Sequence, residues 1–552
     1  MNFKKLTALT ISVVMCIALL AACAPTQPAT PAPGAADPAP GAAAPAAPTP
    51  TAPEVGAGEI VGGEAPEAEA ILAEEINIST DATNLVAINV FAPPSNTPAT
   101  AHVIWMTHDR LVERDEATGD FVYRLATSVE TDDYQTYIFN LRQGVVFHDG
   151  APFTANDVVA TIERSRTAPG SPAFDIWRPV STATALDDYT LELVLGGVNV
   201  TFLNSISNPL GAIISAGGIE SGTDEGIWNG TGPFELTSFV SNDHATVERF
   251  DGFWGEAPPT RVINIRHVPE MGARTMMMRN NETQIATSIN TADVHIFQND
   301  PSFTVTEHVH INPMPIIFNM NDPIAGDLNF RRAIGHAINR TEMGLASRGD
   351  LFIPVADEVA WGFVTDFRYP EAGMPPFEQN LDLVAQYLEA SSWNGEEIVI
   401  SAGITTAIRI AEMMQEQLVR AGIPTRVNQL DPAGFTAAAT YNDNQIQLGI
   451  HMMPVMRCAS SMHSAFYPGA GLNRASYNNP AATALMDRAL LTVDVAERAE
   501  IYRELQEIVT ADLPYINIFW SVHTMTTAEG VGGVIIAADV RHDFRNIFQT
   551  IG

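Results

Sequence analysis

A run of proline and alanine near the N-terminus decides which part of this chain can fold. Residues 24–69 open with APTQPATPAPGAADPAPGAAAPAAPTPTAPE, which is nearly uncharged and has no hydrophobic periodicity. Such a segment cannot bury enough apolar surface to offset the entropy of ordering it, so we expect an extended, disordered tether. The remainder, about 480 of the 552 residues, is too long for one hydrophobic core and predicts two or three domains.

The residues before the tether read MNFKKLTALTISVVMCIALLAAC. Lys4 and Lys5 precede an apolar run that ends in small residues, so residues 1–22 have the pattern of a secretory leader. A single membrane-spanning anchor is the alternative, although the run is a little short for one. The last four letters, LAAC, resemble a bacterial lipobox, which implies cleavage before Cys23 and lipidation of its thiol. The chain would then be extracytoplasmic and lipid-anchored to the cell membrane, on its periplasmic side or the outer cell surface.

The charge and the cysteines of the chain exclude several partners. The formal net charge is −35, whereas binding to nucleic acid requires a basic surface. This charge also repels anionic lipid, so contact with the membrane needs the lipid anchor. Of the three cysteines, Cys16 lies in the leader and Cys23 in the lipobox. Only Cys458 is left, which excludes a disulfide framework and a multi-cysteine metal site. We expect no cofactor.

The rest of the chain mixes strand and helix patterns. YIFNLR at residues 137–142, TLELVL at 190–195 and PIIFNM at 315–320 predict strands. TANDVVATIERSR predicts a helix that begins at the N-cap Thr154, with Asp157 placed favourably in its first turn. AERAEIYRELQEIVTADLP predicts an amphipathic helix that Pro514 ends. Together these patterns predict an α/β protein.

Several blocks resemble, in order, the family-5 extracytoplasmic solute-binding proteins of peptide- and nickel-type ABC transporters. They extend over roughly 400 residues, and one position that is tryptophan in the family is Val129 here. The blocks are LATSVETDDYQTYIFNLRQGVVFHDGAPFTANDVVATIERS, GTGPFELTSF followed by VERFDGFWGEAPP, IIFNMNDPIAGDLNFRRAIGHAINR, ASYNNPAATALMDRAL and ERAEIYRELQEIVTADLPYINIF.

This resemblance implies an α/β, two-lobe fold like that of the periplasmic binding proteins, of the large peptide-binding type with mixed sheets. Lobe I would be discontinuous, with residues 70–314 and a returning segment 514–552, and lobe II would be residues 315–513. A solute binds in the cleft, the lobes close over it about a hinge, and the loaded protein docks on a membrane permease. A separate ATPase subunit drives transport, and this chain, expected to be a monomer, carries no catalytic step.

The stretch IHMMPVMRCASSMHS, residues 450–464, follows a predicted strand of lobe II. In the family, the loop after this strand lines the cleft, and peptide-binding members place an acidic residue there against the α-amino group of the ligand. Between His451 and Phe466 this chain has no Asp or Glu, and Arg457 is the only full charge. The positively charged α-amino group of a peptide buried in the cleft would therefore have no carboxylate partner in this stretch. The departure favours a ligand with an anionic or neutral group facing Arg457, or one bound mainly by methionine and apolar contacts.

The same stretch has three interpretations. The first is a cleft lining without metal, formed by His451, Met453, Met456, Arg457 and His463, because methionine fills adaptable pockets. The second is contact with a soft metal ion or a metal–chelator complex through His451, Met453 and His463. Strand alternation puts His451 and Met453 on one face, but spacing alone does not make the ligands converge. The third is ordinary core and loop.

Other cleft candidates come from the resemblance and from large aromatic residues. Asn89 and Phe91 lie in INVFAPP, the first strand and loop of lobe I, where members of the family touch ligand. Trp361 in VAWGF and Trp520 in NIFWSV lie near the expected cleft rim and hinge, where aromatic rings give contact area at low entropic cost. Core packing is the alternative for each.

The leading hypothesis is a lipid-anchored receptor that delivers an oligopeptide-like or other small organic solute to an ABC importer. A receptor of the same family for nickel or a metal chelate is the first alternative. A surface receptor or adhesin without a transport role is the second. A secreted hydrolase is disfavoured because the chain has no GxSxG, HExxH or Walker A motif.

Overall fold

The structure is a computed structural model. It describes residues 60–61, 72–80, 85, 87–92, 97–115, 120–167, 171–349, 351–355, 374–403, 405–431, 434–435, 437–438, 445–448, 461–470, 472–537 and 541–551. All of these belong to the second of two units, residues 1–50 and 51–552, into which the chain divides. The predicted leader, Cys23 and most of the predicted tether lie outside the described residues. Where helices are described, none is both long and apolar enough to cross a membrane.

The largest sheet of the described residues has 11 strands, in the order β16-β15-β17-β13-β18-β12-β2-β11-β10-β9, with β14 paired to β18. Parallel and antiparallel pairs are mixed, as β2 pairs in parallel with β11 and β10 pairs antiparallel with β9. The strands other than β13 and β18 are β2 Glu75–Thr80, β9 Phe234–Val240, β10 His244–Arg249, β11 Val262–His267, β12 Ile285–Thr287, β14 Phe352–Pro354, β15 Ile398–Ala402, β16 Thr425–Gln429 and β17 Ile446–Leu448.

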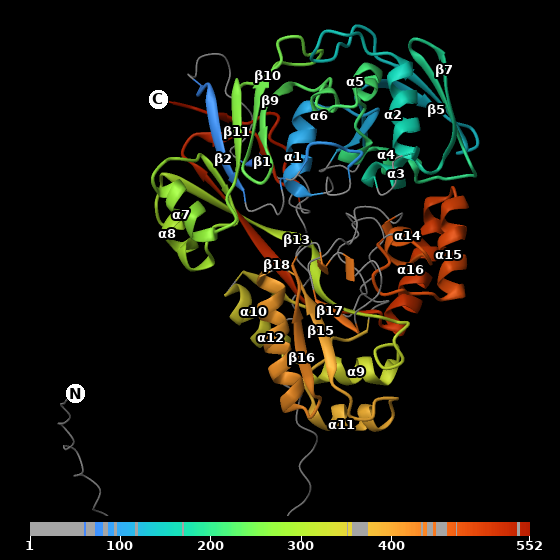
Figure 1. Cartoon of the computed structure of the whole chain (residues 1–552), viewed down its shortest axis with the longest axis vertical. Coiled ribbons are helices and arrows are strands. Elements are labelled where there is room, and N and C mark those ends of the chain that lie inside the picture. The colour runs from blue at the N-terminus through green and yellow to red at the C-terminus, as the bar shows by residue number, and fades with distance from the viewer. Residues whose placement is uncertain are drawn as a thin grey trace, which may run out of the picture. The chain divides into compact units, whose positions relative to one another are not determined.

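Two long antiparallel strands, β13 Phe303–Phe318 and β18 Tyr515–Ala528, form the centre of this sheet. Figure 1 shows them side by side, although about 200 residues of chain separate them. Their register shifts between Val309 and Pro313, and again between Met314 and Pro315. Proline has no N–H to donate to a ladder, so these prolines account for the irregular middle of β13.

Smaller sheets and the helices pack around this frame. One sheet has the order β5-β6-β8-β7, and three further pairs are β3–β4, β1–β20 and β19–β21. These strands are β1 Ile60–Val61, β3 Val112–Arg114, β4 Phe121–Tyr123, β5 Ala126–Glu130, β6 Thr136–Leu141, β7 Val180–Asp187, β8 Thr190–Leu195, β19 Val531–Gly532, β20 Val534–Ile535 and β21 Phe548–Gln549. The helices are α1 Pro98–Thr107, α2 Ala155–Thr167, α3 Pro172–Trp177, α4 Phe202–Ile206, α5 Ala216–Ser221, α6 Asp224–Ile227, α7 Met271–Arg279, α8 Val294–Gln298, α9 Leu328–Ala337, α10 Arg340–Arg348, α11 Leu381–Glu389, α12 Thr405–Arg420, α14 Ser461–Phe466, α15 Pro480–Leu491 and α16 Val495–Asp512, with 3-10 turns at Pro209–Gly211 and Thr291–Asp293.

The local patterns in the sequence account for several of these elements. The three predicted strands are β6, β8 and the end of β13, and the two predicted helices are α2 and α16. At the start of α2 the Asp157 carboxylate accepts from the N–H of Thr154 at 2.8 Å and from its hydroxyl at 3.1 Å. Helix α16 ends at Leu513, which is left-handed with φ 53°, directly before Pro514.

Buried hydrophobic side chains of the described residues gather around separate centres. The first core draws on residues 61–285 and 525–547. A second core draws on residues 314–519, and a third, mainly between α14, α15 and α16, adjoins it. A small fourth cluster lies at α7 and α8. We call the described residues 60–285 and 525–551 the first half, and the described residues 314–519 the second half.

The N-terminal edge of the first half begins earlier than the sequence predicts. Ile60 and Val61, inside the segment expected to be tether, pair antiparallel with Ile535 and Val534. Val61 is buried in the first core. The expectation of a tether up to residue 69 was therefore wrong at these two positions, because their β-branched side chains complete an apolar surface that the C-terminal strands supply.

A buried ion network fastens the C-terminal segment to the first half. The Arg545 guanidinium donates to Asp543 at 2.7 Å and to Glu113 at 2.9 Å. Arg110, which is 1% exposed, also pairs with Glu113. Nearby, Arg124 pairs with Asp109 at 2.9 Å. Each charge in this network has an opposite charge beside it, which is the condition under which buried ions are tolerated.

Candidate functional site

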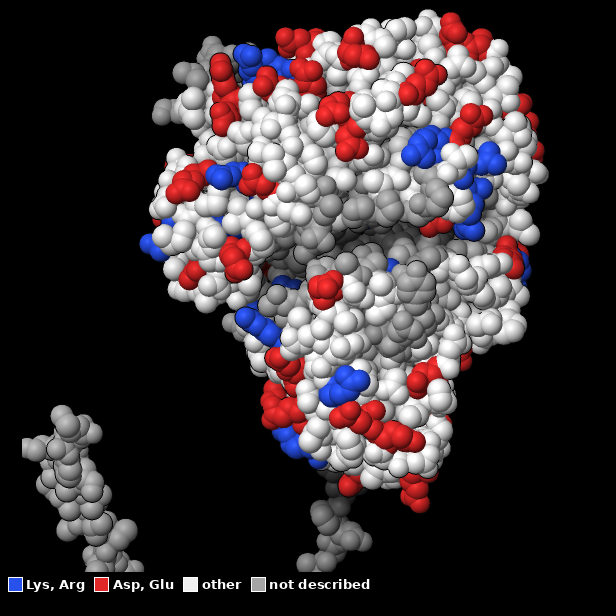
Figure 2. Space-filling model, viewed as in Figure 1, with Lys and Arg blue, Asp and Glu red and all other residues white. Residues whose placement is uncertain are grey.

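A hollow crosses the middle of the 51–552 unit (Figure 2). In the same orientation Figure 1 shows α1 to α6 above this level, α9 to α12 below it and α14 to α16 at its right-hand end, with β13 and β18 running from the upper part to the lower. Helices and sheets of both halves therefore border the hollow. A concave surface between two cores is the usual place for a small-molecule site.

Asn89 and Phe91 are fixed by the first half. The Asn89 Oδ1 accepts from the N–H of Phe91 at 3.0 Å, and Asn89 Nδ2 donates to Asp224 at 3.1 Å. Phe91 is 5% exposed and belongs to the first core, with the Arg164 guanidinium 5.3 Å from its ring centre. Phe91 thus has a packing role in this structure, and contact of either residue with a ligand stays a prediction.

Trp520 lies on β18, in the part of the strand that pairs with both β13 and β14. It stands opposite Pro313 on β13 and Ile353 on β14, and it is 4% exposed. This places the predicted aromatic residue in the strands that join the halves. Its contact with a ligand is untested.

The stretch 450–464 is described only from Ser461 onward. Its Met462 is buried in the third core. His463 lies on α14 and stacks on Tyr467 with ring centres 5.7 Å apart. Burial lowers the pKa of His463 to about 4, so its imidazole is neutral at pH 7. His451, Met453, Met456 and Arg457 lie outside the described residues, as does Trp361.

No group of three or more His, Cys, Asp or Glu side chains with metal-binding geometry occurs among the described residues. Of the predicted soft-metal set, His451 and Met453 lie outside those residues, so the described His463 cannot decide the question alone. The metal interpretation stays a prediction.

Five histidines lie close together beside the paired strands β13 and β18. The sequence analysis did not predict this cluster. His308 and His310 on β13 lie 5.9 and 5.2 Å from His523 on β18, measured between ring centres. His542 lies 5.1 Å from His308, and His102 of α1 lies 5.7 Å from His542. The HVH spacing on a strand puts His308 and His310 on one face, and that was the available signal. Burial lowers the pKa of His523 well below its ordinary value, so this imidazole stays neutral.

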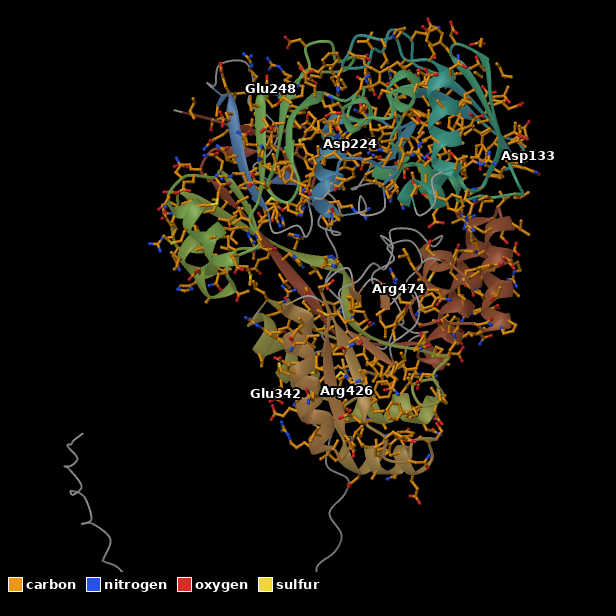
Figure 3. The ribbon with its side chains drawn as sticks, in the orientation of Figure 1. Asp133, Asp224, Glu248, Glu342, Arg426 and Arg474 are labelled. Atoms are coloured by element: carbon orange, nitrogen blue, oxygen red, sulfur yellow. The ribbon has the colours of Figure 1, made fainter. Side chains whose placement is uncertain are left out.

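Arg474 is a second residue that sequence reasoning missed. It is half-buried, and burial lowers the pKa of its guanidinium. Figure 3 labels it between the second-half strands and α16, at the level of the lower edge of the hollow in Figure 2. Its segment is held in place, because Asn473 Nδ2 donates to the Tyr477 carbonyl at 2.8 Å and the Met320 N–H donates to the Ala475 carbonyl at 2.8 Å.

Solved structures share this architecture over most of its length. A binding protein AgaA with agropinic acid, from A. tumefaciens R10, has a TM-score of 0.76 at 20% identity and covers 87% of this chain and 99% of its own. DppA from Helicobacter pylori with the peptide STSA has a TM-score of 0.75 at 20% identity, covering 86% and 98%. NikA from Staphylococcus aureus with Ni(L-His)2 has a TM-score of 0.73 at 16% identity, covering 86% and 100%. The fold is that of the periplasmic binding proteins, which confirms the predicted fold class.

The family within that class follows from the sequence. The profile of the bacterial extracellular solute-binding proteins, family 5 (middle), matches residues 120–473, more than half of the chain. The chain therefore belongs to this family, which confirms the resemblance. Among curated relatives, the glutathione-binding protein GsiB of Escherichia coli K12 is 26% identical over 435 residues, covering 75% of this chain and 83% of its own. GsiB of Salmonella typhi is 26% identical over 432 residues with the same coverage.

Proposed function

We propose that this chain is the substrate-binding lipoprotein of an ABC importer. It captures an oligopeptide-like or other small organic solute between two lobes and delivers it to a membrane permease, while a separate subunit hydrolyses ATP. The observation that carries this proposal is the hollow bordered by two separately packed halves and spanned by β13 and β18. The family membership and the relatives named for binding glutathione and peptides support it.

We assign lobe I to residues 70–314 with the return at 514–552, and lobe II to residues 315–513. The lobes close about the crossing strands, where the prolines of β13 interrupt the ladder. A solute shifts the balance toward the closed form only if it contacts both lobes. The chain is then a monomeric receptor that releases its ligand chemically unchanged, and not an enzyme.

A solute with an anionic group fits this site best. Arg474 adds a half-buried positive charge at the level of the lower edge of the hollow, in a chain whose net charge is −35. A guanidinium binds a carboxylate with two parallel hydrogen bonds, and partial desolvation strengthens them. Arg457, the only full charge between His451 and Phe466, would add to the same preference. Peptides and glutathione carry carboxylates, which agrees with the names of the relatives.

The lipobox places this receptor on the extracytoplasmic face of the cell membrane. Cys23→Ser removes the thiol that would be lipidated. The variant is expected to remain as an uncleaved precursor or to leave the membrane fraction, as fractionation and mass spectrometry of the N-terminus would reveal. A Cys23→Ser protein that is processed and anchored like the wild type would contradict the lipoprotein assignment.

A receptor for nickel or another metal chelate is the second candidate. The likeness to NikA and the histidines and methionines of residues 451–463 favour it. A metal chelate of histidine also carries carboxylates, so Arg474 serves both candidates. A metal-dependent signal that His451→Ala or His463→Ala abolishes would select this candidate. A surface receptor or adhesin without transport remains the alternative if no solute binds.

The test is a thermal-shift screen of the Cys23→Ser chain with glutathione, the dipeptide Met-Leu, and Ni²⁺ with and without L-histidine. A ligand at about 100 times its Kd adds about 2.7 kcal/mol to the free energy of unfolding, which raises Tm by a few degrees.

We expect Arg474→Gln to weaken binding of the active ligand at least about tenfold. The matched control is Arg426→Gln. Arg426 lies on β16 and its exposed side chain pairs with Glu397, which directly precedes β15. Absence of any shift across the screen would contradict the proposal.

A further inference from the structure

The two halves meet at a second place besides β13 and β18. The backbone N–H of Val200, in the first half, donates to the carbonyl of Leu490, in the second half, with an N···O distance of 3.2 Å. Figure 1 shows α3 and α4 above α15 and α16 at the edge of the hollow away from β18 and α10. We call this hydrogen bond, together with Arg178, Tyr467 and Asp487 around it, the seam.

The first-half side of the seam is held rigidly. The N–H of Asn199 donates to the Tyr134 carbonyl at 2.9 Å, and the Tyr137 hydroxyl donates to the Asn199 carbonyl at 3.0 Å. The Asn199 side chain also accepts from the N–H of Thr201 at 3.0 Å. With both neighbours fixed to the first half, the N–H of Val200 has a set direction, and its partner belongs to the other half.

The second-half side is the end of a helix. Leu490 lies in the last turn of α15, where backbone carbonyls have no partner within the helix. The turn beyond it is fixed, because Arg498 donates to the Thr492 carbonyl at 2.7 Å. Val200 therefore caps the C-terminus of α15 from across the hollow. This contact exists only while the two halves are together, since neither half can supply both groups.

Opposite charges flank the hydrogen bond. A hydrogen bond from Tyr467 to Asp487 raises the pKa of Tyr467, and Arg178 opposes that rise. The same Asp487 and Arg178 act with opposite sign on His463, one turn earlier on α14. Arg178 caps α3 in the first half and its side chain is 66% exposed, whereas Asp487 lies on α15 in the second half. Arg178 and Asp487 thus carry opposite charges on the two sides of the seam, and Arg178 also lies 3.8 Å from Asp175 on its own helix.

We propose that the seam is a latch whose residues set the affinity for solute without touching it. The inference rests on the proposed function, because a latch matters only if the halves separate. The apparent Kd of a two-state receptor depends on the fraction of molecules in the binding-competent state. Each contact made only in the closed form raises that fraction. Opening about β13 and β18 moves the far edge of the hollow most, so the seam breaks first.

Hydrogen exchange tests the latch without any solute. Two adjacent amides form an internal comparison: the N–H of Asn199 is bonded within the first half, and that of Val200 across the seam. Asp487→Arg sets two like charges against each other. We expect it to speed exchange at Val200 at least about twofold and to leave Asn199 unchanged. Adding Arg178→Asp restores the opposite pair, and exchange at Val200 should return toward the wild-type rate.

Small-angle scattering and binding complete the experiment. In the absence of solute, Asp487→Arg should increase the radius of gyration. The charge-swapped double variant should return the radius of gyration toward the wild-type value, and Arg426→Gln should leave it unchanged. With glutathione as the probe, Asp487→Arg should weaken binding about two- to fivefold. Equal exchange at Val200 in the wild type, Asp487→Arg and the double variant, or a charge swap that does not restore the wild-type rate, would overturn the latch. A failure of the proposed function shows differently: the latch passes the exchange and scattering tests, but no solute shifts Tm.

Discussion

At the residue scale, the ion network around Arg545 joins the last residues of the chain to residue 113. Arg545→Ala would leave Asp543 and part of Glu113 buried without their cation. Removing one partner of a buried pair costs about 3–5 kcal/mol, so we expect a loss of that size in the free energy of unfolding, measured in urea.

The control for this substitution is Arg420→Ala. Arg420 pairs with Glu416 on the surface, where the two side chains are 60% and 74% exposed. Such pairs contribute at most about 1 kcal/mol. Similar losses for Arg545→Ala and Arg420→Ala would mean that the buried network does not stabilise the C-terminal segment.

A buried histidine predicts how stability depends on pH. His108 donates from Nε2 to the Ile227 carbonyl at 2.9 Å, and burial lowers its pKa to about 4. The unfolded chain takes up a proton near pH 6.5, whereas the folded protein resists it. Stability is therefore complete above pH 6.5, falls as the pH drops, and levels off below pH 4, a loss of about 3 kcal/mol for this group.

Urea unfolding at pH 7 and pH 4.5 measures that loss. His108→Gln cannot take up the proton, so its free energy of unfolding should fall less between these two pH values than that of the wild type. His295→Gln, at an exposed position of the short helix α8, is the control for replacing a histidine by glutamine. An unchanged pH dependence in His108→Gln would assign the acid sensitivity to other groups.

Individual site residues were the hardest part to predict from the sequence. The ring of Phe91 is buried in the first core with Arg164 beside it, and its contact with a ligand stays a prediction. No pattern in the sequence marked Arg474, because half-burial at the edge of a hollow depends on how distant segments pack. The histidines at 102, 308, 310, 523 and 542 come together from four separate segments. Only the HVH pair within that group was visible as a local pattern.

At the element scale, the start of α2 is a good test of local stabilisation. One Asp157 oxygen accepts from the N–H and hydroxyl of Thr154, and the other accepts from the N–H of Ala216 at 2.8 Å. Asp157→Ala removes both sets of bonds at a buried position. We expect a loss of about 2 kcal/mol in the free energy of unfolding.

Glu163→Ala on the same helix is the matched control, because Glu163 is exposed and alanine favours a helix. Its effect should stay within about 0.5 kcal/mol. If Asp157→Ala is equally mild, the helix start is not fixed by this carboxylate.

Short-range patterns predicted these elements, and long-range pairing did not follow from them. The residues at the start of α2 and the alternation of β6 and β8 depend on neighbours in sequence, and the structure contains these three elements. The partner of β13 begins about 200 residues later, and no local pattern specifies that register. Ile60 and Val61 were assigned to the tether for the same reason, since their partners are Ile535 and Val534.

At the scale of the whole molecule, the net charge of −35 predicts a response to salt. Like charges on a folded body repel one another more than they do in the expanded chain, and added ions screen this repulsion. We expect Tm to rise by a few degrees between about 0.01 and 0.15 M NaCl. KCl should give the same rise if screening is the cause. A fall in Tm would mean that attractive surface pairs outweigh the excess of negative charge.

The placement of the last described residues has a consequence for synthesis. Phe544 and Ile547 belong to the first core, whose other members begin at Val61. A ribosome makes the N-terminal side of that core long before it makes this end, and the second half is completed in between. The first core therefore stays incomplete, with apolar surface exposed, until residues 541–549 have been synthesised. A nonsense codon at position 541 would remove these residues with the rest of the C-terminus and leave an aggregation-prone chain, although every strand and helix described in the second half is present.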